Sequence, residues 1–179
     1  YTWTVDTGDG SYVSESSAAA RRVLASMGSG AVDYRELNVF FLDGVGDSLY
    51  GIAGGIPGPL GSPGTDASGV LVSIDTHRYS DWTVNYQEVG ATVVHELGHQ
   101  LGLNHTTEAD GSANDPLSDT PDCSLSYDFD ASGDLSPEEC ADLDGSYVMF
   151  WTAPSSDMLQ SAWSSQQRDI LFSSPVMVD

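Results

Sequence analysis

Residues 95–105, with the sequence HELGHQLGLNH, hold three of the four histidines in the chain. His95 and His99 are four residues apart, so on a helix their rings stand one above the other and can bind one metal ion. Gly102 can adopt a positive φ, which would end the helix and fold the chain back so that His105 supplies a third nitrogen. Three nitrogen ligands leave the fourth tetrahedral position to water, which is the arrangement of a catalytic zinc site.

Glu96 follows the first of these histidines and is placed to act as a base on water rather than as a metal ligand. An incidental grouping is the alternative, but a chance match at this composition is on the order of one in a hundred thousand chains. A purely structural zinc site would more usually be closed by cysteine. The fourth histidine, His77, follows the end of a predicted strand, and we expect it at the surface or in a substrate cleft rather than on the metal.

The helix that carries the first two histidines is predicted to begin at Asn85, where Glu88 completes a capping-box pattern. We expect its apolar residues to share one arc, with His95 and His99 on the other side. The residues of this arc are Val89, Val93, Val94, Leu97 and Leu101.

Caps and apolar periodicity predict three further helices. One covers residues 14–27. A short one covers residues 137–143, with Ser136 as its cap. The last begins at Ser164, with Gln167 as its capping-box partner.

Two apolar runs, residues 37–42 and 69–75, predict buried strands. Residues 51–64 are rich in Gly and Pro, which indicates a loop or a ragged edge strand. The order of elements indicates an α/β layer packed against a loop-rich C-terminal half.

The composition limits the partners of the chain. Its 179 residues are enough for one domain, and they include 27 Asp and Glu against 5 basic residues, for a net charge of −22. Such a field repels nucleic acid and anionic lipid, and no apolar stretch is long enough to span a membrane. We therefore expect neither nucleic acid nor membrane as a partner.

Cys123 and Cys140 bracket a short acidic segment. A disulfide between them would stabilise the fold by roughly 3 kcal/mol in the chain-entropy model, and would imply an oxidising compartment outside the cytoplasm. Two reduced, buried cysteines are the alternative. The chain begins at Tyr1 without a signal region, so we expect a mature secreted form from which a signal peptide and any pro-segment have been removed.

The segment HELGHQLGLNH resembles the extended zinc signature of the metzincin clan of metalloendopeptidases. Met149, within SYVMFW, is the candidate for the methionine turn that lies beneath the metal in that clan. The chain is most similar to the pappalysin-like family, over about residues 37–171. The supporting features are the NVFFL and GVLVSID strands, the YGIAGGIPG loop, the gap from His105 to Met149, the DTP step at 119–121 and the closing WSSQQRDIL.

The resemblance implies a metzincin-like α/β catalytic domain. Its mixed, twisted sheet would have an antiparallel edge strand and two long helices above it. A loop-rich C-terminal half would contain the methionine turn and a C-terminal helix. We expect one domain over residues 1–179, with an N-terminal subdomain over 1–102 and a C-terminal subdomain over 103–179.

The chain departs from the pappalysin-like pattern at two points. Trp151 stands two residues after Met149, where the family usually has a Tyr that stabilises the transition state. Indole cannot bind zinc, although its N–H can donate a hydrogen bond, and Tyr147 is not at the family position. The chain also has fewer cysteines than is usual in the family.

Residues 128–139 match the twelve-residue EF-hand loop, with Gly133 at position six and Glu139 at position twelve. This pattern predicts a structural Ca²⁺ between the two cysteines, and a solvated acidic loop is the alternative. The predicted ligands are Asp128, Asp130, Ser132, Asp134 and Glu139.

Together these features predict a secreted, monomeric, zinc-dependent endopeptidase that acts on protein or peptide substrates. His95, His99 and His105 would hold Zn²⁺ and Glu96 would act as general base. An extended substrate would pair with an exposed edge strand near residues 49–54. The alternatives are a calcium-stabilised binding or surface module with a vestigial zinc site and, less favoured, a zinc amidase acting on a small substrate.

Overall fold

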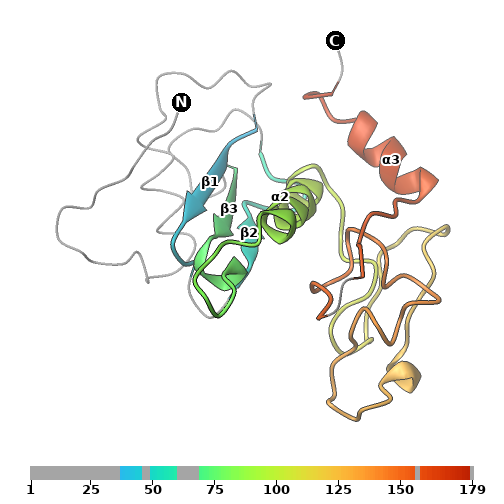
Figure 1. Ribbon diagram of the computed structural model, residues 1–179. Helices are drawn as coiled ribbons and strands as arrows, with labels where there is room; N and C mark the ends of the chain where they lie inside the picture. The colour runs from blue at the N-terminus through green and yellow to red at the C-terminus, as the bar shows by residue number, and fades with distance from the viewer. Residues whose placement is uncertain (1–36, 46–48, 60–68, 156–157, 178–179) are drawn as a thin grey trace, which may run out of the picture.

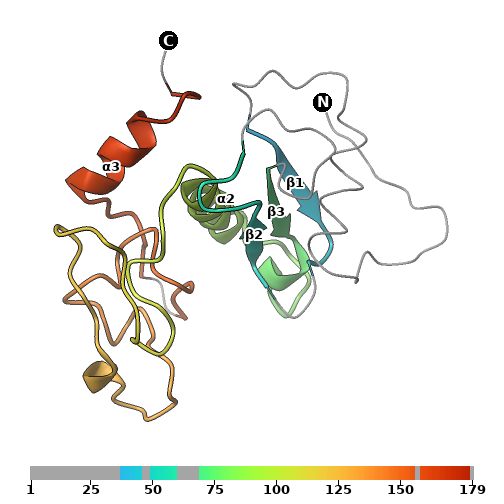
Figure 2. The ribbon, with the colours of Figure 1, turned by 180° about the vertical axis from the view of Figure 1, so that it is seen from behind.

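The computed structural model describes residues 37–45, 49–59, 69–155 and 158–177 of the chain. The helix predicted over residues 14–27 lies outside the described residues. Figures 1 and 2 show helix α2 (Tyr86–Gln100) between a small sheet and a C-terminal half with little regular structure. The α/β layer packed against a loop-rich half is therefore confirmed.

The sheet has three strands in the order β1 (Val39–Leu42), β3 (Val70–Ser73), β2 (Gly51–Ala53). β1 runs parallel to β3, and β2 runs antiparallel to it as an edge strand of the described sheet. The central strand β3 is fully buried, as its apolar sequence predicts. β1 was also expected to be buried, but it lies at the other edge and the Phe41 side chain is 55% exposed.

Asn85 caps α2, and its Oδ1 accepts a hydrogen bond from the backbone N–H of Glu88 at 3.3 Å. The capping box is only half formed, because the backbone N–H of Asn85 donates to the His77 carbonyl instead. The Glu88 carboxylate accepts from the Asn85 side-chain amide at 2.9 Å. The cap therefore also holds Glu88 in place.

The expected apolar arc of α2 is not its most buried face. Val94 is 45% exposed, whereas Thr92, Glu96 and Gln100 are buried. These three polar residues follow the 3.6-residue period and lie on one side of the helix. Gln100 uses this position to accept a hydrogen bond from the Gly54 N–H at 3.1 Å, which fixes the chain as it leaves β2. Apolar content alone could not distinguish this face from the one around Val94.

Gly102 ends α2 as predicted, with a φ of +110°. Its N–H donates to the His99 carbonyl and the Leu103 N–H donates to the Gly98 carbonyl, both at 2.9 Å. These two bonds form a Schellman motif, in which glycine is favoured at the residue with positive φ. The turn sends the chain directly toward His105.

The C-terminal half contains a 3₁₀ turn, η2 (Leu125–Tyr127), and helix α3 (Ser165–Phe172). The predicted capping box of α3 is confirmed in full, with Ser164 and Gln167 bonded in both directions. The helix predicted over residues 137–143 is wrong: these residues form successive turns. Gly145 packs against the carbonyl of Pro137, so closely that a Cβ atom on it would lie 2.1 Å from that oxygen. The chain therefore turns back on itself here instead of continuing as a regular helix.

The described chain therefore has one long helix and one short helix with the mixed sheet. No helix among the described residues combines the length and apolar character needed to cross a bilayer.

Candidate metal centre and substrate cleft

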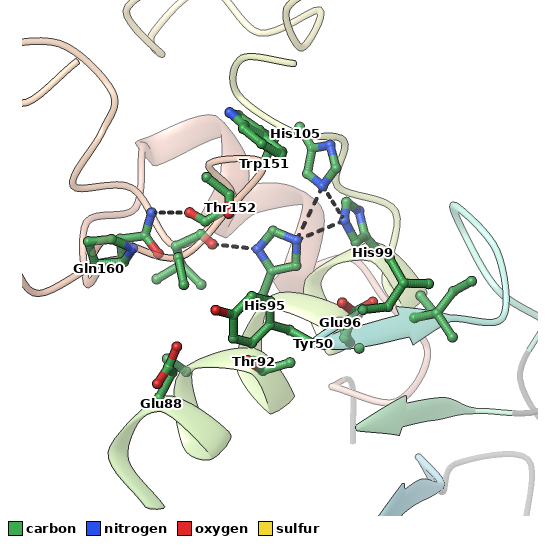
Figure 3. A pocket seen from close by; sticks show the side chains of 18 of the residues that line it. Tyr50, Glu88, Thr92, His95, Glu96, His99, His105, Trp151, Thr152 and Gln160 are labelled. Atoms are coloured by element: carbon green, nitrogen blue, oxygen red, sulfur yellow. Dashed lines mark hydrogen bonds between the residues drawn. The ribbon is translucent and has the colours of Figure 1, made fainter. Parts of the chain in front are cut away.

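Three histidine rings converge at the C-terminal end of α2 (Figure 3). The Nε2 atoms of His95 and His99 are 3.1 Å apart, those of His99 and His105 are 3.0 Å apart, and those of His95 and His105 are 3.3 Å apart. A tetrahedral Zn²⁺ with Zn–N distances of 2.0–2.1 Å places its ligand nitrogens about 3.3 Å from one another. The predicted triad is thus brought together with the spacing that a zinc ion requires.

The other ring nitrogen of each histidine faces an oxygen. The Nδ1 atoms of His95 and His99 lie 2.7 Å from the carbonyl oxygens of Val148 and Leu103, and Nδ1 of His105 lies 3.0 Å from the Glu108 carboxylate. Each Nδ1 therefore carries the proton and donates it. The three Nε2 lone pairs then face one another, an arrangement that a shared cation stabilises.

Burial keeps the first two rings neutral. It lowers the pKa of His95 to about 3, with the neighbouring His99 and His105 rings adding to the effect. Burial also lowers the pKa of His99 to about 4, and His105 adds to it. Neutral imidazole is the form that binds a metal, so both rings are ready for ligation at neutral pH.

Glu96 is buried, with 7% of its surface exposed, and lines the same cavity as the histidines. Its side chain passes beneath β2 at Gly51. A Cβ atom on Gly51 would lie 2.7 Å from the Glu96 Cγ and 2.9 Å from its Oε1. Gly51 therefore allows the edge strand to cross directly over this carboxylate.

Met149 is fully buried against α2. Its sulfur packs against Gly98 of α2, where a Cβ atom would lie 2.4 Å from Sδ. The preceding residue supplies the Val148 carbonyl that orients His95, and the Met149 carbonyl accepts the N–H of Thr106 at 2.8 Å. The segment around Met149 thus supports both the first and the third histidine.

A long open cleft surrounds the metal centre. One wall is formed by residues 49–53 of the edge-strand region, the floor by α2, and the opposite wall by Val148 and residues 151–154 and 158–160. The predicted edge strand therefore borders the cleft. Among the described residues, the charged side chains that line it, apart from histidine, are Glu88, Glu96 and Glu108.

His77 is neither at the surface nor in the cleft, contrary to expectation. It is 1% exposed, its Nδ1 faces the Ser73 carbonyl, and its Nε2 lies 2.8 Å from the Thr92 hydroxyl. Its ring meets the ring of Tyr50 edge-on, with centroids 5.0 Å apart. His77 therefore acts as a buried support for Tyr50, which does line the cleft.

Trp151 lines the cleft on the side opposite Tyr50. Its indole N–H donates to the Leu135 carbonyl at 2.6 Å, and its ring packs on the cluster around Phe150 and the cysteines. The N–H is therefore already engaged within the fold. Leu135 in turn donates its N–H to the Ala109 carbonyl at 2.7 Å, beside the Glu108 that orients His105.

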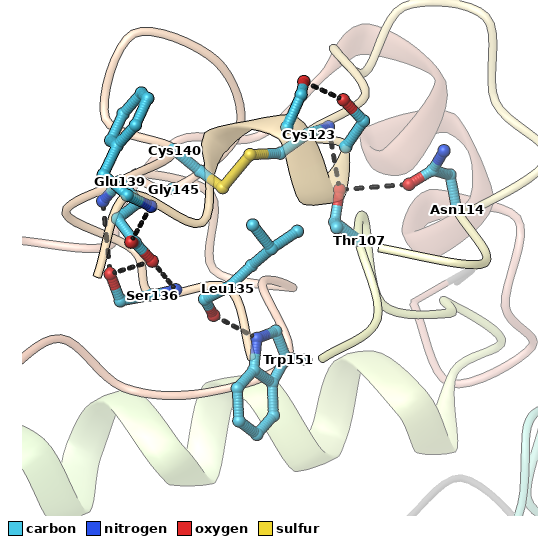
Figure 4. Close-up of a disulfide and its surroundings, with 12 residues drawn as sticks. Thr107, Asn114, Cys123, Leu135, Ser136, Glu139, Cys140, Gly145 and Trp151 are labelled. Carbon is cyan, nitrogen blue, oxygen red and sulfur yellow. Dashed lines mark hydrogen bonds between the residues drawn. A yellow bond between two sulfur atoms is a disulfide. The ribbon is translucent and has the colours of Figure 1, made fainter. Parts of the chain in front are cut away.

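The disulfide between Cys123 and Cys140 is confirmed, and both residues are fully buried (Figure 4). The backbone N–H of Cys123 donates to the Thr107 hydroxyl at 3.2 Å. The disulfide therefore closes the loop that carries Leu135 and ties it to the chain just after His105.

The loop over residues 128–139 brings three of its acidic side chains together. Carboxylate oxygens of Asp128, Asp130 and Glu139 lie within 4.8 Å of one another, while Asp134 is outside this group. The Ser132 hydroxyl lies 3.5 Å from the Asp128 carboxylate and donates to the Asp134 carbonyl at 2.9 Å.

The groups that orient the histidines were not among the residues predicted from the sequence. Glu108 could have been found, because it stands three residues after His105 and an acidic partner is typical of a metal-binding histidine. The carbonyls of Val148 and Leu103 carry no side-chain signal. The roles of Gly51 and Trp151 depend on contacts between segments far apart in the sequence.

Comparison with known proteins agrees with this geometry. The family described as metallo-peptidase family M12 (Reprolysin_5) matches residues 5–168. Neither the curated proteins nor the solved structures yield a match. Because the matched region covers most of the chain and contains all three histidines, this chain belongs to metallopeptidase family M12.

Proposed function

We propose that this chain is a secreted zinc endopeptidase of the metzincin type, most similar to the pappalysin-like branch. The observation that carries the proposal is the convergence of three Nε2 lone pairs, each histidine being held by a partner at Nδ1, next to a buried carboxylate in an open cleft. A binding module needs no such carboxylate beside its metal ligands. In this proposal, Met149 forms the methionine turn.

His95, His99 and His105 would hold the zinc ion. Zinc supplies Lewis-acid chemistry, in that it polarises a carbonyl group and lowers the pKa of water toward neutrality. Glu96 accepts the proton of the attacking water and delivers it to the leaving nitrogen. The three hydrogen bonds at Nδ1 keep the ligand rings fixed during these steps.

The substrate would be an extended peptide strand. β2 has β3 on one side and borders the cleft along the other, so its outer edge can pair with a peptide backbone. Gly51 places this edge directly above Glu96. The scissile bond would therefore lie between the edge strand and the metal centre.

Digestion of a peptide library tests this proposal, with cleavage sites identified by mass spectrometry. We expect internal peptide bonds to be cleaved, cleavage to stop in a zinc chelator such as 1,10-phenanthroline, and cleavage to return when zinc is restored. The absence of any cleavage by zinc-loaded protein would favour the binding-module alternative. Hydrolysis of small amides alone would favour an amidase.

The acidic loop over residues 128–139 would bind a structural Ca²⁺. The proposal rests on the EF-hand pattern of the sequence together with the approach of Asp128, Asp130 and Glu139. Calcium in hundredfold excess over its Kd would raise the Tm by roughly 5 to 10 °C. The Glu139→Gln variant should lose this calcium-dependent increase, whereas equal Tm values of the unsubstituted protein in calcium and in chelator would contradict the proposal.

A further inference from the structure

The cleft extends along α2 well beyond the metal centre. Glu88, Thr92 and His95 are spaced four and three residues apart, so they lie on one face of the helix. Glu88 and His95 are seven positions apart, which corresponds to about 10 Å along the helix axis. Figure 3 shows the Glu88 carboxylate on the side of α2 that faces the cleft.

The cleft combines one fixed carboxylate with tyrosine side chains in its lining. Glu88 is held by the Asn85 side-chain amide at 2.9 Å, and this neutral donor leaves its negative charge in place. Tyr50 and Tyr79 line the same cleft. The Tyr50 ring is held edge-on by His77, which is itself bonded at both ring nitrogens.

No arginine or lysine among the described residues lines the cleft to neutralise Glu88. Arg78, which precedes Tyr79 in the sequence, forms an ion pair with Asp75 at 3.3 Å and donates a hydrogen bond to the Trp82 carbonyl at 3.0 Å. The negative charge of Glu88 acts on two neighbouring side chains. The pKa of Tyr50 is raised mainly by burial and further by Glu88. The pKa of His77 is lowered mainly by burial, and Glu88 partly opposes this lowering. The net charge of the chain, −22, is negative like the charge of Glu88.

We infer that Glu88, with Tyr50 and Tyr79, forms a subsite that selects a basic side chain of the substrate, arginine or lysine, within three residues of the scissile bond. The inference rests on the proposed peptidase function. A guanidinium or ammonium group is attracted both by the carboxylate and by the faces of tyrosine rings. Three residues of an extended peptide span about 10 Å, which matches the distance along α2 from the metal centre to Glu88.

The test uses two fluorogenic peptides that are identical except for Arg or Gln at one position. That position is varied in turn over the three residues on each side of the bond that the protein cleaves. We expect kcat/KM to favour the Arg peptide by about tenfold or more at one position. The ratio should fall to near one in Glu88→Gln and remain substantial in Glu88→Asp, which keeps the charge. Because the readout is a ratio, it is independent of the fraction of folded variant.

Asp110→Asn is the matched control, since it removes one exposed carboxylate outside the cleft and should leave the ratio unchanged. Chelator-sensitive cleavage without any preference for Arg, or a preference that persists in Glu88→Gln, would overturn the subsite and leave the peptidase proposal intact. Failure of zinc-loaded protein to cleave any peptide of the library would overturn both.

Discussion

At the scale of single residues, the metal centre depends on where each histidine places its one ring proton. Two of the acceptors are backbone carbonyls, of Val148 and Leu103, and the third is the Glu108 carboxylate. A carbonyl cannot be removed by substitution, so Glu108 is the one position where the ring support can be altered directly.

Gly51 is the residue that limits how closely the edge strand can approach Glu96. We expect Gly51→Ala to displace either β2 or the carboxylate, because the added Cβ would meet Glu96 at 2.7 Å. A misplacement of about 1 Å near reacting groups can lower the rate about a hundredfold. Peptide hydrolysis should therefore fall by at least about tenfold in kcat/KM, with the zinc content unchanged.

Gly90→Ala is the matched control for this substitution. Gly90 is exposed on the same helix, and a Cβ atom there would meet nothing within 4 Å. Alanine is the better helix former, so this variant should be as active as the parent and slightly more stable. Full activity of Gly51→Ala would show that β2 does not constrain Glu96.

Asp144 is a buried carboxylate behind the disulfide. Burial raises its pKa, and the nearby hydroxyl groups of Thr107 and Thr106 only partly oppose this effect. The folded state therefore binds this proton more tightly than the unfolded state does. Its contribution to stability is largest at low pH and is lost as the pH rises from about 4 through the raised pKa.

We therefore expect Asp144→Asn to raise the Tm at pH 7 more than at pH 4, because the amide mimics the protonated acid. Thermal unfolding at the two pH values measures this difference. Asp142→Asn, at an exposed position nearby, should show no such pH dependence. A lower Tm of Asp144→Asn at pH 7 would mean that the carboxylate is compensated by a partner charge.

At the scale of elements, the disulfide-closed loop supports one wall of the cleft. Leu135 accepts the Trp151 N–H and donates to Ala109, so this one residue connects the wall to the segment that carries His105. The engaged N–H agrees with a packing role for Trp151. It also explains how an indole is accommodated two residues after Met149.

Trp151→Phe removes this hydrogen bond and leaves the buried Leu135 carbonyl without its donor. We expect the free energy of unfolding to fall by about 1–2 kcal/mol. KM should rise more than kcat falls, because Trp151 forms a wall of the cleft. Thermal unfolding and steady-state kinetics measure the two effects. A gain in kcat in Trp151→Tyr alone would instead indicate that a hydroxyl donor is missing at this position.

At the scale of the whole molecule, the sequence predicts what depends on local spacing. The i, i+4 histidines, the turn at Gly102 and the caps at Asn85 and Ser164 are set by neighbouring residues. The burial of His77 and the exposure of Val94 are not determined by neighbouring residues, because they depend on which segments pack against α2. The absence of the predicted helix over residues 137–143 also depends on packing between segments, because Gly145 packs against the Pro137 carbonyl.

The net charge of −22 makes the stability of the whole chain dependent on salt. Repulsion between like charges destabilises the compact state, and salt screens it within a Debye length of about 10 Å at 0.1 M. Raising NaCl from 0.05 to 0.5 M in the presence of chelator should raise the Tm by a few degrees. A Tm that is flat or falling over this range would mean that local pairing already offsets the repulsion.

In the proposed mechanism, three histidines hold the metal while Glu96 performs the proton transfers. Parallel determination of zinc content and peptide hydrolysis in Glu96→Ala and in the unsubstituted chain tests it most directly. We predict that the variant keeps one zinc ion per chain, because Glu96 is not a ligand, while kcat falls by about 10² to 10⁴-fold. Retained turnover, or loss of zinc from a folded variant, would contradict this division of roles.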